Sequence, residues 1–247
     1  MKISVVTVVF NSVEFIEDCI LSVVGQDHLT VEYIVIDGGS TDGTIEVINR
    51  YLKQISYFCS EKDRGLYDAL NKGIAVATGE VLGILHADDC FADRRVLSAV
   101  AECFQRNECE AVYGNLNFIK RHFPAEAHRK WFSKVYSRKD LQYGWMPAHP
   151  TLFLKKELFL SRGGYLLNFG TSADYELILR YFYRNRIDAV FLDRVLVNMR
   201  LGGVSNGSLR KRSRAAVSDY KALIAHEIPY PSLVLLLKKL RKIRQFF

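Results

Sequence analysis

The chain has 247 residues, of which 49% are hydrophobic and 25% are charged, and its formal net charge is +7. This length and composition suit one large α/β domain with a sizeable core. The positive charge is concentrated at the C-terminal end, because residues 210–247 carry ten Lys and Arg against two acidic residues. The rest of the chain is close to neutral, which argues against a nucleic-acid-binding domain, since such a domain spreads basic residues over its functional surface.

Cysteine usage and the lack of long apolar runs indicate a cytoplasmic location. The five cysteines are odd in number and form no CxxC pair, which argues against a disulfide framework or a zinc site and for a reducing compartment. The N-terminal run ISVVTVVFN lacks the length and the cleavage site of a signal peptide, and no run reaches the roughly 18 apolar residues of a membrane span.

The first half of the chain alternates predicted strands and helices. We expect strands over Lys2–Phe10, Val31–Ile36, Ile55–Cys59 and Val81–Leu85, and helices over Val13–Val24, Thr41–Leu52 and Leu66–Ala77. Alternation at this interval is typical of right-handed βαβ units. The predicted fold class is therefore α/β, with a Rossmann-like, mostly parallel central sheet and helices on both faces.

The glycine pattern disfavours a dinucleotide-binding site in this sheet. The first strand runs into FNSVEF without a glycine, and DGGSTDG does not match the G-x-G-x-x-G spacing. Without those glycines the backbone cannot approach a pyrophosphate closely at the first turn. A phosphorylated ligand would need another group to neutralise its charge, and a metal ion held by aspartates would do so.

The second half of the chain is less regular. We expect a helix over Arg94–Gln105, a strand over Ala111–Phe118, a polar and basic excursion over 119–139, a helix over 171–186 and a strand over Val190–Val197.

Aspartates follow two of the predicted parallel strands, where ligands of such sheets bind. Asp37 ends VEYIVI, and the adjacent Asp88 and Asp89 follow VLGIL. If the chain stays extended there, Asp88 and Asp89 face opposite ways and have different roles, one of them binding a divalent cation. The alternative is an ordinary turn in which aspartates cap backbone N–H groups.

Charged residues also gather where the helix after the third strand begins. Asp63, Arg64, Asp68 and Lys72 fall in SEKDRGLYDALNKG, and a helix N-terminus with cations nearby suits a diphosphate. The alternative is an amphipathic helix with a solvated face.

Three motifs together carry a resemblance to a known family. IVIDGGSTDGT, SEKDRGLYDALNKGIAVATGEVLGILHADD and SADYELILR, in this order over residues 1–206, resemble family 2 glycosyltransferases of the GT-A fold, especially bacterial members that build lipopolysaccharide, capsule or exopolysaccharide. His86, in HADD, departs from the pattern, because similar proteins more often have Asn there. The resemblance implies a nucleotide-sugar-binding half over 1–118, an acceptor and catalytic-base half over 119–206, and a basic helical tail over 207–247.

The resemblance also implies a role for each matching residue. Nucleotide-sugar contacts fall on Thr7, Asn11, Asp37, Asp63, Arg64, Asp68, Lys72 and Asp88, with Asp37 accepting from the base, usually uracil. Asp89 is expected to bind Mn²⁺ or Mg²⁺, and Asp174 to be the catalytic base.

Two of these residues have a plainer structural interpretation. Thr171 to Asp174 fits the [ST]-x-x-[DE] capping box, which alone would make Asp174 a helix cap. His149, in MPAHPTLF, matches an acceptor-side position, yet a lone His between two prolines is often a loop-packing residue.

The C-terminal run IPYPSLVLLLKKLRKIRQFF mixes apolar and basic residues and is too short to span a bilayer. We expect an amphipathic helix on an anionic membrane surface, the alternative being a terminal helix that packs on the domain.

The predicted function is that of an inverting, metal-dependent glycosyltransferase on the cytoplasmic face of the membrane. The donor is a nucleotide-diphosphate sugar, with UDP favoured, and the acceptor is a saccharide, often lipid-linked in this class. The alternatives are a nucleotidyltransferase, which would need a Gly- and Arg/Lys-rich loop after the first strand, and a non-catalytic nucleotide-sugar or membrane-scaffold module.

Overall fold

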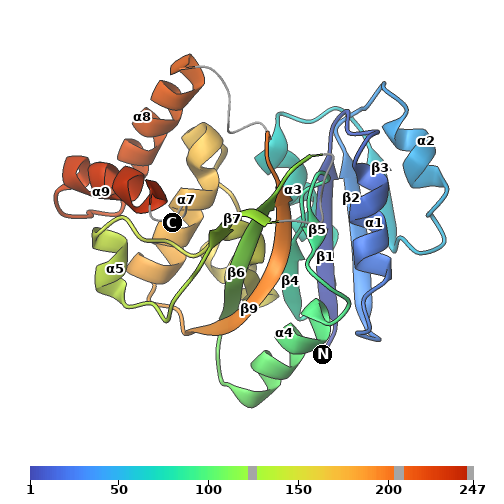
Figure 1. Cartoon of the computed structure of the whole chain (residues 1–247), viewed down its shortest axis with the longest axis horizontal. Coiled ribbons are helices and arrows are strands. Elements are labelled where there is room, and N and C mark those ends of the chain that lie inside the picture. The colour runs from blue at the N-terminus through green and yellow to red at the C-terminus, as the bar shows by residue number, and fades with distance from the viewer. Residues whose placement is uncertain (122–126, 203–208, 244–247) are drawn as a thin grey trace.

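Runs of β-branched residues form a sheet at the centre of the molecule (Figure 1). The computed structural model describes residues 1–121, 127–202 and 209–243. Within that part of the chain the strands are β1 (Ile3–Val9), β2 (Val31–Asp37), β3 (Tyr57–Ser60), β4 (Val81–Ile84), β5 (Cys90–Phe91), β6 (Ala111–Ile119), β7 (Ala127–Trp131), β8 (Phe153–Lys155) and β9 (Ala189–Arg200).

The sheet order is β3-β2-β1-β4-β8-β6-β9-β5, with β7 paired to β6. The four strands β3, β2, β1 and β4 are parallel, as predicted. Beyond them β8 runs antiparallel to both of its neighbours, β9 is parallel to β6, and β5 and β7 are antiparallel additions. The α/β class is confirmed, and the second half of the sheet is mixed.

Helices cover both faces of the sheet. They are α1 (Ile16–Val24), α2 (Thr44–Asn49), α3 (Leu66–Val76), α4 (Val96–Arg106), α5 (Arg138–Gln142), α6 (Lys156–Arg162), α7 (Ala173–Ile178), α8 (Leu209–Ala225) and α9 (Pro231–Ile243), with 3-10 turns η1 (His149–Thr151) and η2 (Leu167–Ser172). A π-helical segment, η3 (Leu179–Arg184), continues α7, so the helix predicted over 171–186 spans two helix types.

Side-chain alternation along the strands produces two hydrophobic cores. Val5 and Val9 of β1 pack with α1, α2 and α4, whereas Val6 and Val8 pack with α3, α6 and α7. In Figure 1 the sheet stands between α1 and α2 on its right and α7 on its left, with α8 and α9 farther out on the left.

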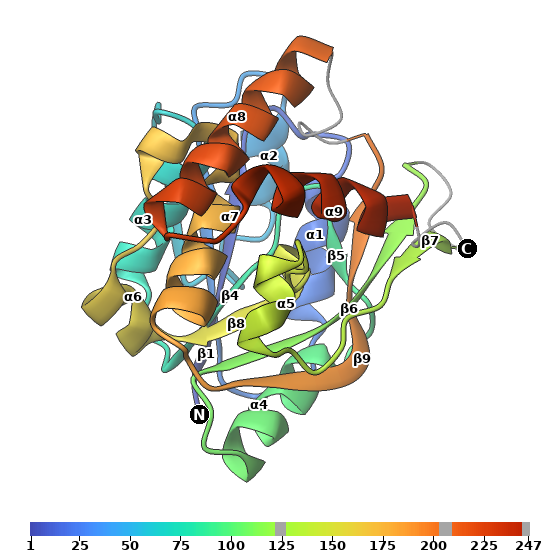
Figure 2. The same cartoon turned by 90° about the vertical axis from the view of Figure 1, so that its left-hand side faces the viewer.

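The tail forms α8 and α9, which lie over α5 and α7 (Figure 2). Val234 is buried, the Lys238 ammonium lies 3.3 Å from the centre of the Tyr175 ring, and Lys238 pairs with Asp219 at 2.9 Å. One face of α9 therefore packs on the domain, as the alternative interpretation predicted. No helix in the described residues is long and apolar enough to cross a membrane, and residues 244–247 of the predicted amphipathic helix lie outside the described part.

Candidate functional site

The carboxyl ends of β2 and β4 meet at one edge of the sheet. Both strands are parallel to β1 and flank it, so Asp37 and the turn that holds Asp88 and Asp89 lie at the same edge. This placement agrees with the prediction from the sequence.

Asp37 organises the loop that follows β2. Its buried carboxylate accepts from the backbone N–H groups of Gly39 and Ser40, at 3.0 and 2.9 Å, and from the Ser60 hydroxyl at 2.6 Å. Asn11 joins this loop to the end of β1, because its Oδ1 accepts from Thr41 N at 2.9 Å.

The predicted nucleoside contacts differ in exposure. Asn11 is exposed and has a left-handed backbone, with φ of 49°. Thr7 is fully buried, and its hydroxyl accepts from Tyr33 Oη at 3.2 Å, on the α1 side of the sheet. The contacts of Thr7, Asn11 and Asp37 with a nucleoside remain predictions.

Charged residues at the start of α3 form ion pairs. Arg64 donates to the buried Asp68 from its backbone N at 3.0 Å and from its guanidinium at 2.8 Å, which holds the pKa of Asp68 below its usual range. Lys72 pairs instead with Glu61, at 2.7 Å, a partner that the sequence did not single out.

Asp63 brings this segment against the loop that follows β2. Its Oδ1 accepts from Gly65 N at 2.7 Å, while a Cβ placed on Gly38 would lie only 2.7 Å from Asp63 Oδ2. The two loops thus meet closely at the sheet edge. The role of Asp63, Arg64, Asp68 and Lys72 in donor binding is untested by this geometry.

The backbone turns between His86 and Asp89, since Asp89 N donates to His86 O at 2.9 Å. The expectation of an extended segment is therefore wrong. The two carboxylates nevertheless lie in different surroundings: Asp88 acts electrostatically on His86 together with Asp174, whereas Asp89 contacts β9.

Asp89 holds a buried oxygen without a partner. The residue is 1% exposed, its Oδ1 accepts from Arg200 N at 3.0 Å, and its Oδ2 has no hydrogen-bond partner among the described residues. Burial raises the pKa of the Asp89 carboxyl well above its usual range, the charge of Asp88 adds to this, and Arg200 opposes it.

Arg200 is a residue that the sequence reasoning missed. It ends β9, and its buried guanidinium donates to Asp88 O at 3.0 Å and to Asp18 Oδ2 at 2.5 Å. It therefore fixes the turn that carries both aspartates. Its position after a predicted strand was the only signal in the sequence, since its partners lie more than 100 residues away along the chain.

The donor set suits a divalent cation only in part. In the described residues no group of three or more His, Cys, Asp and Glu is arranged to hold a metal ion. The unpartnered Oδ2 of Asp89 is a hard oxygen ligand of the kind that Mn²⁺ and Mg²⁺ prefer, and Mg²⁺ commonly takes one or two carboxylates plus substrate phosphates and water.

Asp174 lies at the second residue of α7 and does not form a capping box. The N-cap is Ser172, whose hydroxyl donates to Ala215 O at 3.3 Å rather than to the helix, and Asp174 Oδ1 accepts from Tyr175 N at 2.8 Å. The capping-box interpretation is therefore wrong, and Asp174 remains half-buried at the edge of the site.

Four rings lie within electrostatic reach of the Asp174 carboxylate. Its charge acts on Tyr67 and Tyr165, whose pKa values are raised first by burial and then by Asp174, and on His86 and His149. The turn after β4 and the start of α7 thus converge on one polar centre.

His149 is a neutral, buried member of that centre at pH 7. Its Nε2 lies 2.8 Å from Tyr165 Oη, and its ring stacks 6.4 Å from the ring of His86. Burial lowers the pKa of His149 to about 4, with Asp174 opposing the shift and His86 adding to it.

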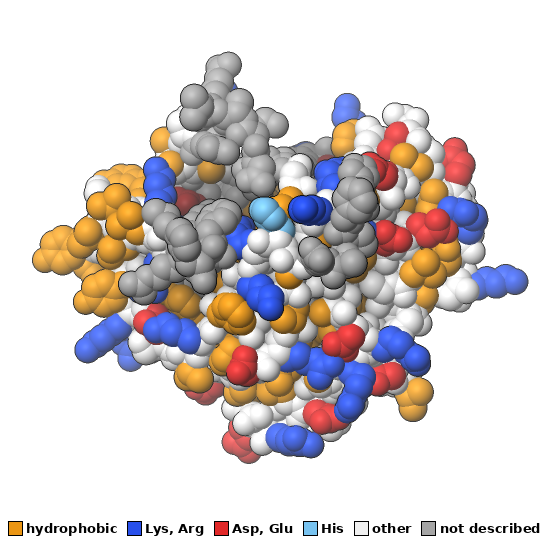
Figure 3. Space-filling view, in the orientation of Figure 1, with side chains coloured by type: hydrophobic (Ala, Val, Ile, Leu, Met, Phe, Trp, Pro, Cys, Tyr) orange, Lys and Arg blue, Asp and Glu red, His pale blue; other side chains and the backbone are white. Residues whose placement is uncertain are grey.

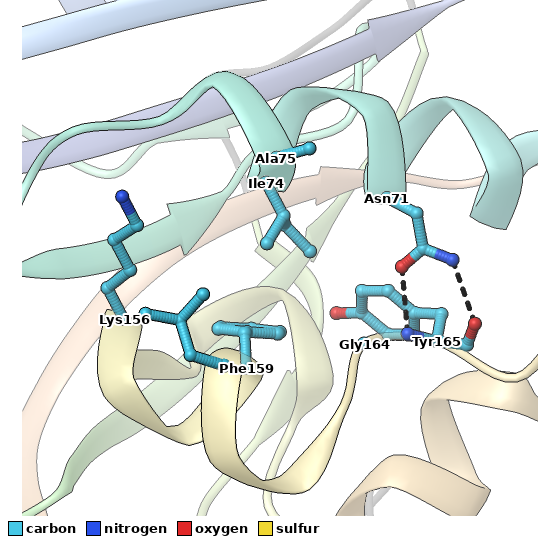
Figure 4. A pocket seen from close by; sticks show the side chains of 8 residues that line it. Asn71, Ile74, Ala75, Lys156, Phe159, Gly164 and Tyr165 are labelled. Carbon is cyan, nitrogen blue, oxygen red and sulfur yellow. Dashed lines mark hydrogen bonds between the residues drawn. The ribbon is translucent and has the colours of Figure 1, made fainter.

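Asn71 of α3 holds Tyr165 in place. The Asn71 amide accepts from Tyr165 N and donates to Tyr165 O, both at 2.8 Å (Figure 4). These residues form one wall of a cavity of about 320 Å³ between α3 and α6. Neither Asn71 nor Tyr165 could be predicted as a site residue from the sequence.

Comparison with known proteins identifies a family for this chain. The model of the family described as Glycosyl transferase family 2 matches residues 4–162. An uncharacterized glycosyltransferase of Mycobacterium tuberculosis (strain CDC 1551 / Oshkosh) is 33% identical over 187 residues, which cover 72% of this chain and 68% of that protein. The PGL/p-HBAD biosynthesis glycosyltransferase of Mycobacterium bovis (strain BCG / Pasteur 1173P2) is 26% identical over 208 residues, covering 82% and 78% of the two chains.

Solved structures share the fold. S. aureus TarS 1-349 in complex with UDP-GlcNAc superposes with a TM-score of 0.69 at 14% identity, covering all of this chain and 89% of that chain. Mannosyltransferase PcManGT from Pyrobaculum calidifontis, in complex with GDP-Man and Mn2+, gives 0.67 at 20% identity, covering 96% and 68%. The fold is of the GT-A type, and with the family model matching well over half of its residues the chain belongs to glycosyl transferase family 2.

Proposed function

We propose that this glycosyltransferase moves a sugar, with inversion at the anomeric carbon, from a nucleotide-diphosphate sugar to a saccharide acceptor. One observation carries the proposal: a single turn after β4 holds Asp88 and the unpartnered oxygen of Asp89, and Asp88 and Asp174, from segments far apart in the chain, both act electrostatically on His86. That arrangement suits a leaving diphosphate on one side of a sugar and a base on the other.

The donor is a nucleotide-sugar, with UDP favoured. Relatives of the same fold were solved with UDP-GlcNAc and with GDP-Man. In this chain the loops that contain Asn11, Asp37 and Asp63 meet at the sheet edge, where ligands of open α/β sheets bind. These loops would bind the nucleoside. Thr7 is buried within β1, so its contribution would be to the shape of the sheet edge below the nucleoside.

The site uses Mn²⁺ or Mg²⁺, as the Mn2+ complex of PcManGT supports. Asp89 would hold the cation through its Oδ2, with Asp88 beside it. When bound, such a cation offsets the negative charge on the diphosphate as it leaves. Arg64 and Lys72, already paired with Asp68 and Glu61, lie along the same segment to position the donor.

Asp174 takes the proton from the acceptor hydroxyl. A general base must come within about 3 Å of that proton, and the half-buried carboxylate of Asp174, which accepts from Tyr175 N, lies at the edge of the site. His149 would line the acceptor side as a neutral ring held by Tyr165. An α-linked donor would give a β-linked product.

The acceptor is a saccharide, and we favour a lipid-linked one of a bacterial surface polysaccharide. The outer faces of α8 and α9 support binding to an anionic cytoplasmic membrane surface: Leu233, Leu236 and Leu240 are exposed on α9, with Lys239 among them.

A donor screen tests the proposed reaction. UDP-, GDP- and dTDP-sugars are compared for binding and for hydrolysis, with and without Mn²⁺. The proteins are the wild type, Asp89→Asn, Asp174→Asn and the matched control Asp188→Asn, because Asp188 is an exposed aspartate just before β9. We expect metal-dependent binding of one nucleotide series, weakened at least tenfold in Asp89→Asn, and unchanged binding but at least 100-fold slower turnover in Asp174→Asn.

Product analysis separates the alternatives. Release of the nucleoside diphosphate and free sugar supports the glycosyltransferase, whereas a nucleoside monophosphate with sugar phosphate points to cleavage within the diphosphate. Binding without turnover in the wild type, for every donor and acceptor saccharide tried, favours a non-catalytic module.

A further inference from the structure

A second cavity lies between α8 and η2, the turn that leads into Asp174. It encloses about 440 Å³, and its lining comes from both elements: Gly170 and Thr171 of η2, and Ser213, Arg214, Val217, Ser218 and Lys221 of α8. The inference below rests on the proposed function, because it names the class of acceptor that this site receives.

The cavity is cationic. Arg214 and Lys221 are seven residues apart on α8, so two helical turns bring them to one face, with Val217 and Ser218 between them. Both side chains are exposed, and within the described residues neither has an ion pair. The acidic residue of this helix, Asp219, is already paired with Lys238 at 2.9 Å.

Hydroxyl groups complete a set of donors suited to an oxyanion. Thr171 and Ser218 line the same cavity, and a Cβ placed on Gly170 would lie 3.9 Å from Ser218 Oγ. Gly170 has φ of 53° and ψ of −126°, a conformation that glycine adopts most readily, so η2 turns sharply here against α8.

The cavity is joined to the catalytic centre through η2. Thr171 is three residues before Asp174, and its carbonyl accepts from Tyr67 Oη at 3.3 Å. Tyr67 in turn lies within the electrostatic reach of Asp174. On the other side Ser172 Oγ donates to Ala215 O at 3.3 Å, which fixes η2 to α8. A ligand in the cavity would therefore be held a short distance from the base.

We propose that this cavity binds a phosphate group of the acceptor, through Arg214 and Lys221, while the acceptor hydroxyl lies at Asp174. A tetrahedral phosphate accepts from several directions at once, which suits a guanidinium, an ammonium and two hydroxyls on two walls. A planar carboxylate shares this oxyanion chemistry, and the test separates the two.

The test uses phenyl phosphate and benzoate as probes of the whole chain, with UDP and Mg²⁺ kept saturating so that the donor site is filled. Dissociation constants come from ³¹P and ¹H NMR titrations of the wild type, of Arg214→Gln/Lys221→Gln, and of the control pair Arg94→Gln/Lys53→Gln, which removes the same charges from exposed positions on the opposite side of the sheet.

We expect saturable binding of phenyl phosphate in the wild type, unchanged in the control and weakened at least tenfold in Arg214→Gln/Lys221→Gln. Equal binding by the two double variants, no saturable binding by the wild type, or tighter binding of benzoate than of phenyl phosphate would each overturn the proposal. UDP affinity, measured in parallel, is expected to be the same in all three proteins. Failure of the wild type to bind any nucleotide would contradict the proposed function. The phosphate proposal would still be tested, because it depends on the difference in phenyl phosphate binding between the two double variants.

Discussion

A single turn after β4 separates two carboxylates that are adjacent in the sequence. Asp88 joins the polar centre around His86, and Asp89 turns toward Arg200 with one oxygen unpaired. A buried carboxylate with an unsatisfied oxygen costs folding free energy, so its presence at this edge agrees with a residue kept for binding rather than for stability.

The cost of that charge is measurable. Asp89→Asn keeps an acceptor for Arg200 N and removes the buried charge, whose carboxyl pKa is raised by burial and by Asp88. Without metal or nucleotide, the free energy of unfolding at pH 7 should be higher in Asp89→Asn than in the wild type, as urea denaturation would measure. A clear loss of stability in Asp89→Asn would show that the ionised carboxylate stabilises the fold, through Arg200.

His149 should make stability fall in mild acid. Its pKa is lowered to about 4 in the folded chain, by burial first, whereas an unfolded histidine titrates near 6.5. Between these values the unfolded chain binds a proton that the folded chain does not, so stability falls as pH drops from about 6.5 toward 4.

The variant His149→Gln removes this titration and keeps a polar group near Tyr165. Between pH 7.5 and pH 5 the wild type should lose about 2 kcal/mol more unfolding free energy than the variant does. Equal pH slopes in urea denaturation of the two proteins would contradict the burial of a neutral ring.

At the scale of elements, local pattern predicted the regular part of the fold. The runs that became β1 and β2 have seven residues each and are rich in β-branched side chains, and their alternation with α1, α2 and α3 predicted the parallel part of the sheet. Asp37 and Asp88 were found for the same reason, because Asp37 ends one parallel strand and Asp88 lies in the turn that follows another.

What the sequence could not predict depends on distant contacts. β5 and β8 have two and three residues, which is too few to show the alternation of side chains that marks a strand in a sequence. They form strands because β5 pairs with β9, and β8 pairs with β4 and β6. Helix α2 is shorter than predicted, because Asp42 accepts from Thr44 N and delays its start. Arg200 and Tyr165 belong to the site only through partners brought together by folding.

The packing of α9 depends on Gly144. This residue has φ of 74°, and a Cβ on it would lie 2.6 Å from Lys238 N and 2.7 Å from Val234 O. In Gly144→Ala we expect α9 to shift away from the domain, with amide exchange over residues 231–243 at least tenfold faster and that of β1 and β2 unchanged.

A second glycine separates backbone strain from the steric clash. Gly43 also has a positive φ, of 100°, but its nearest neighbour is Val13 and not α9. Gly43→Ala should therefore leave exchange in α9 unchanged. Faster exchange of α9 in both variants would mean that general destabilisation, and not the close approach at Gly144, explains the result.

At the scale of the whole molecule, apolar and basic side chains gather on the side away from α1 and α2. Figure 3 shows hydrophobic side chains over α8 and α9 at the left of the view. Val217 and Ile224 of α8 are exposed, as are Leu233, Leu236 and Leu240 of α9, at 49%, 54% and 48%. The proposed phosphate cavity opens on the same helix α8, so a membrane on this side would present a lipid-linked acceptor next to Asp174.

Vesicle binding tests this arrangement. Changing Leu233, Leu236 and Leu240 to Gln removes half-exposed apolar surface that a membrane would bury, worth about 3 kcal/mol together, or roughly a hundredfold in partitioning. The control changes Leu21, Leu29 and Leu52, exposed on the side of α1 and α2, to Gln. In sedimentation with vesicles rich in phosphatidylglycerol, the α9 variant should bind at least tenfold more weakly than the wild type and the control.

Donor hydrolysis should stay unchanged in both variants, because neither set of leucines touches the site. The same loss of binding in the two variants would point to general hydrophobic adsorption. Wild-type binding to neutral phosphatidylcholine vesicles as strong as to anionic ones would remove the basic residues of the tail from the argument.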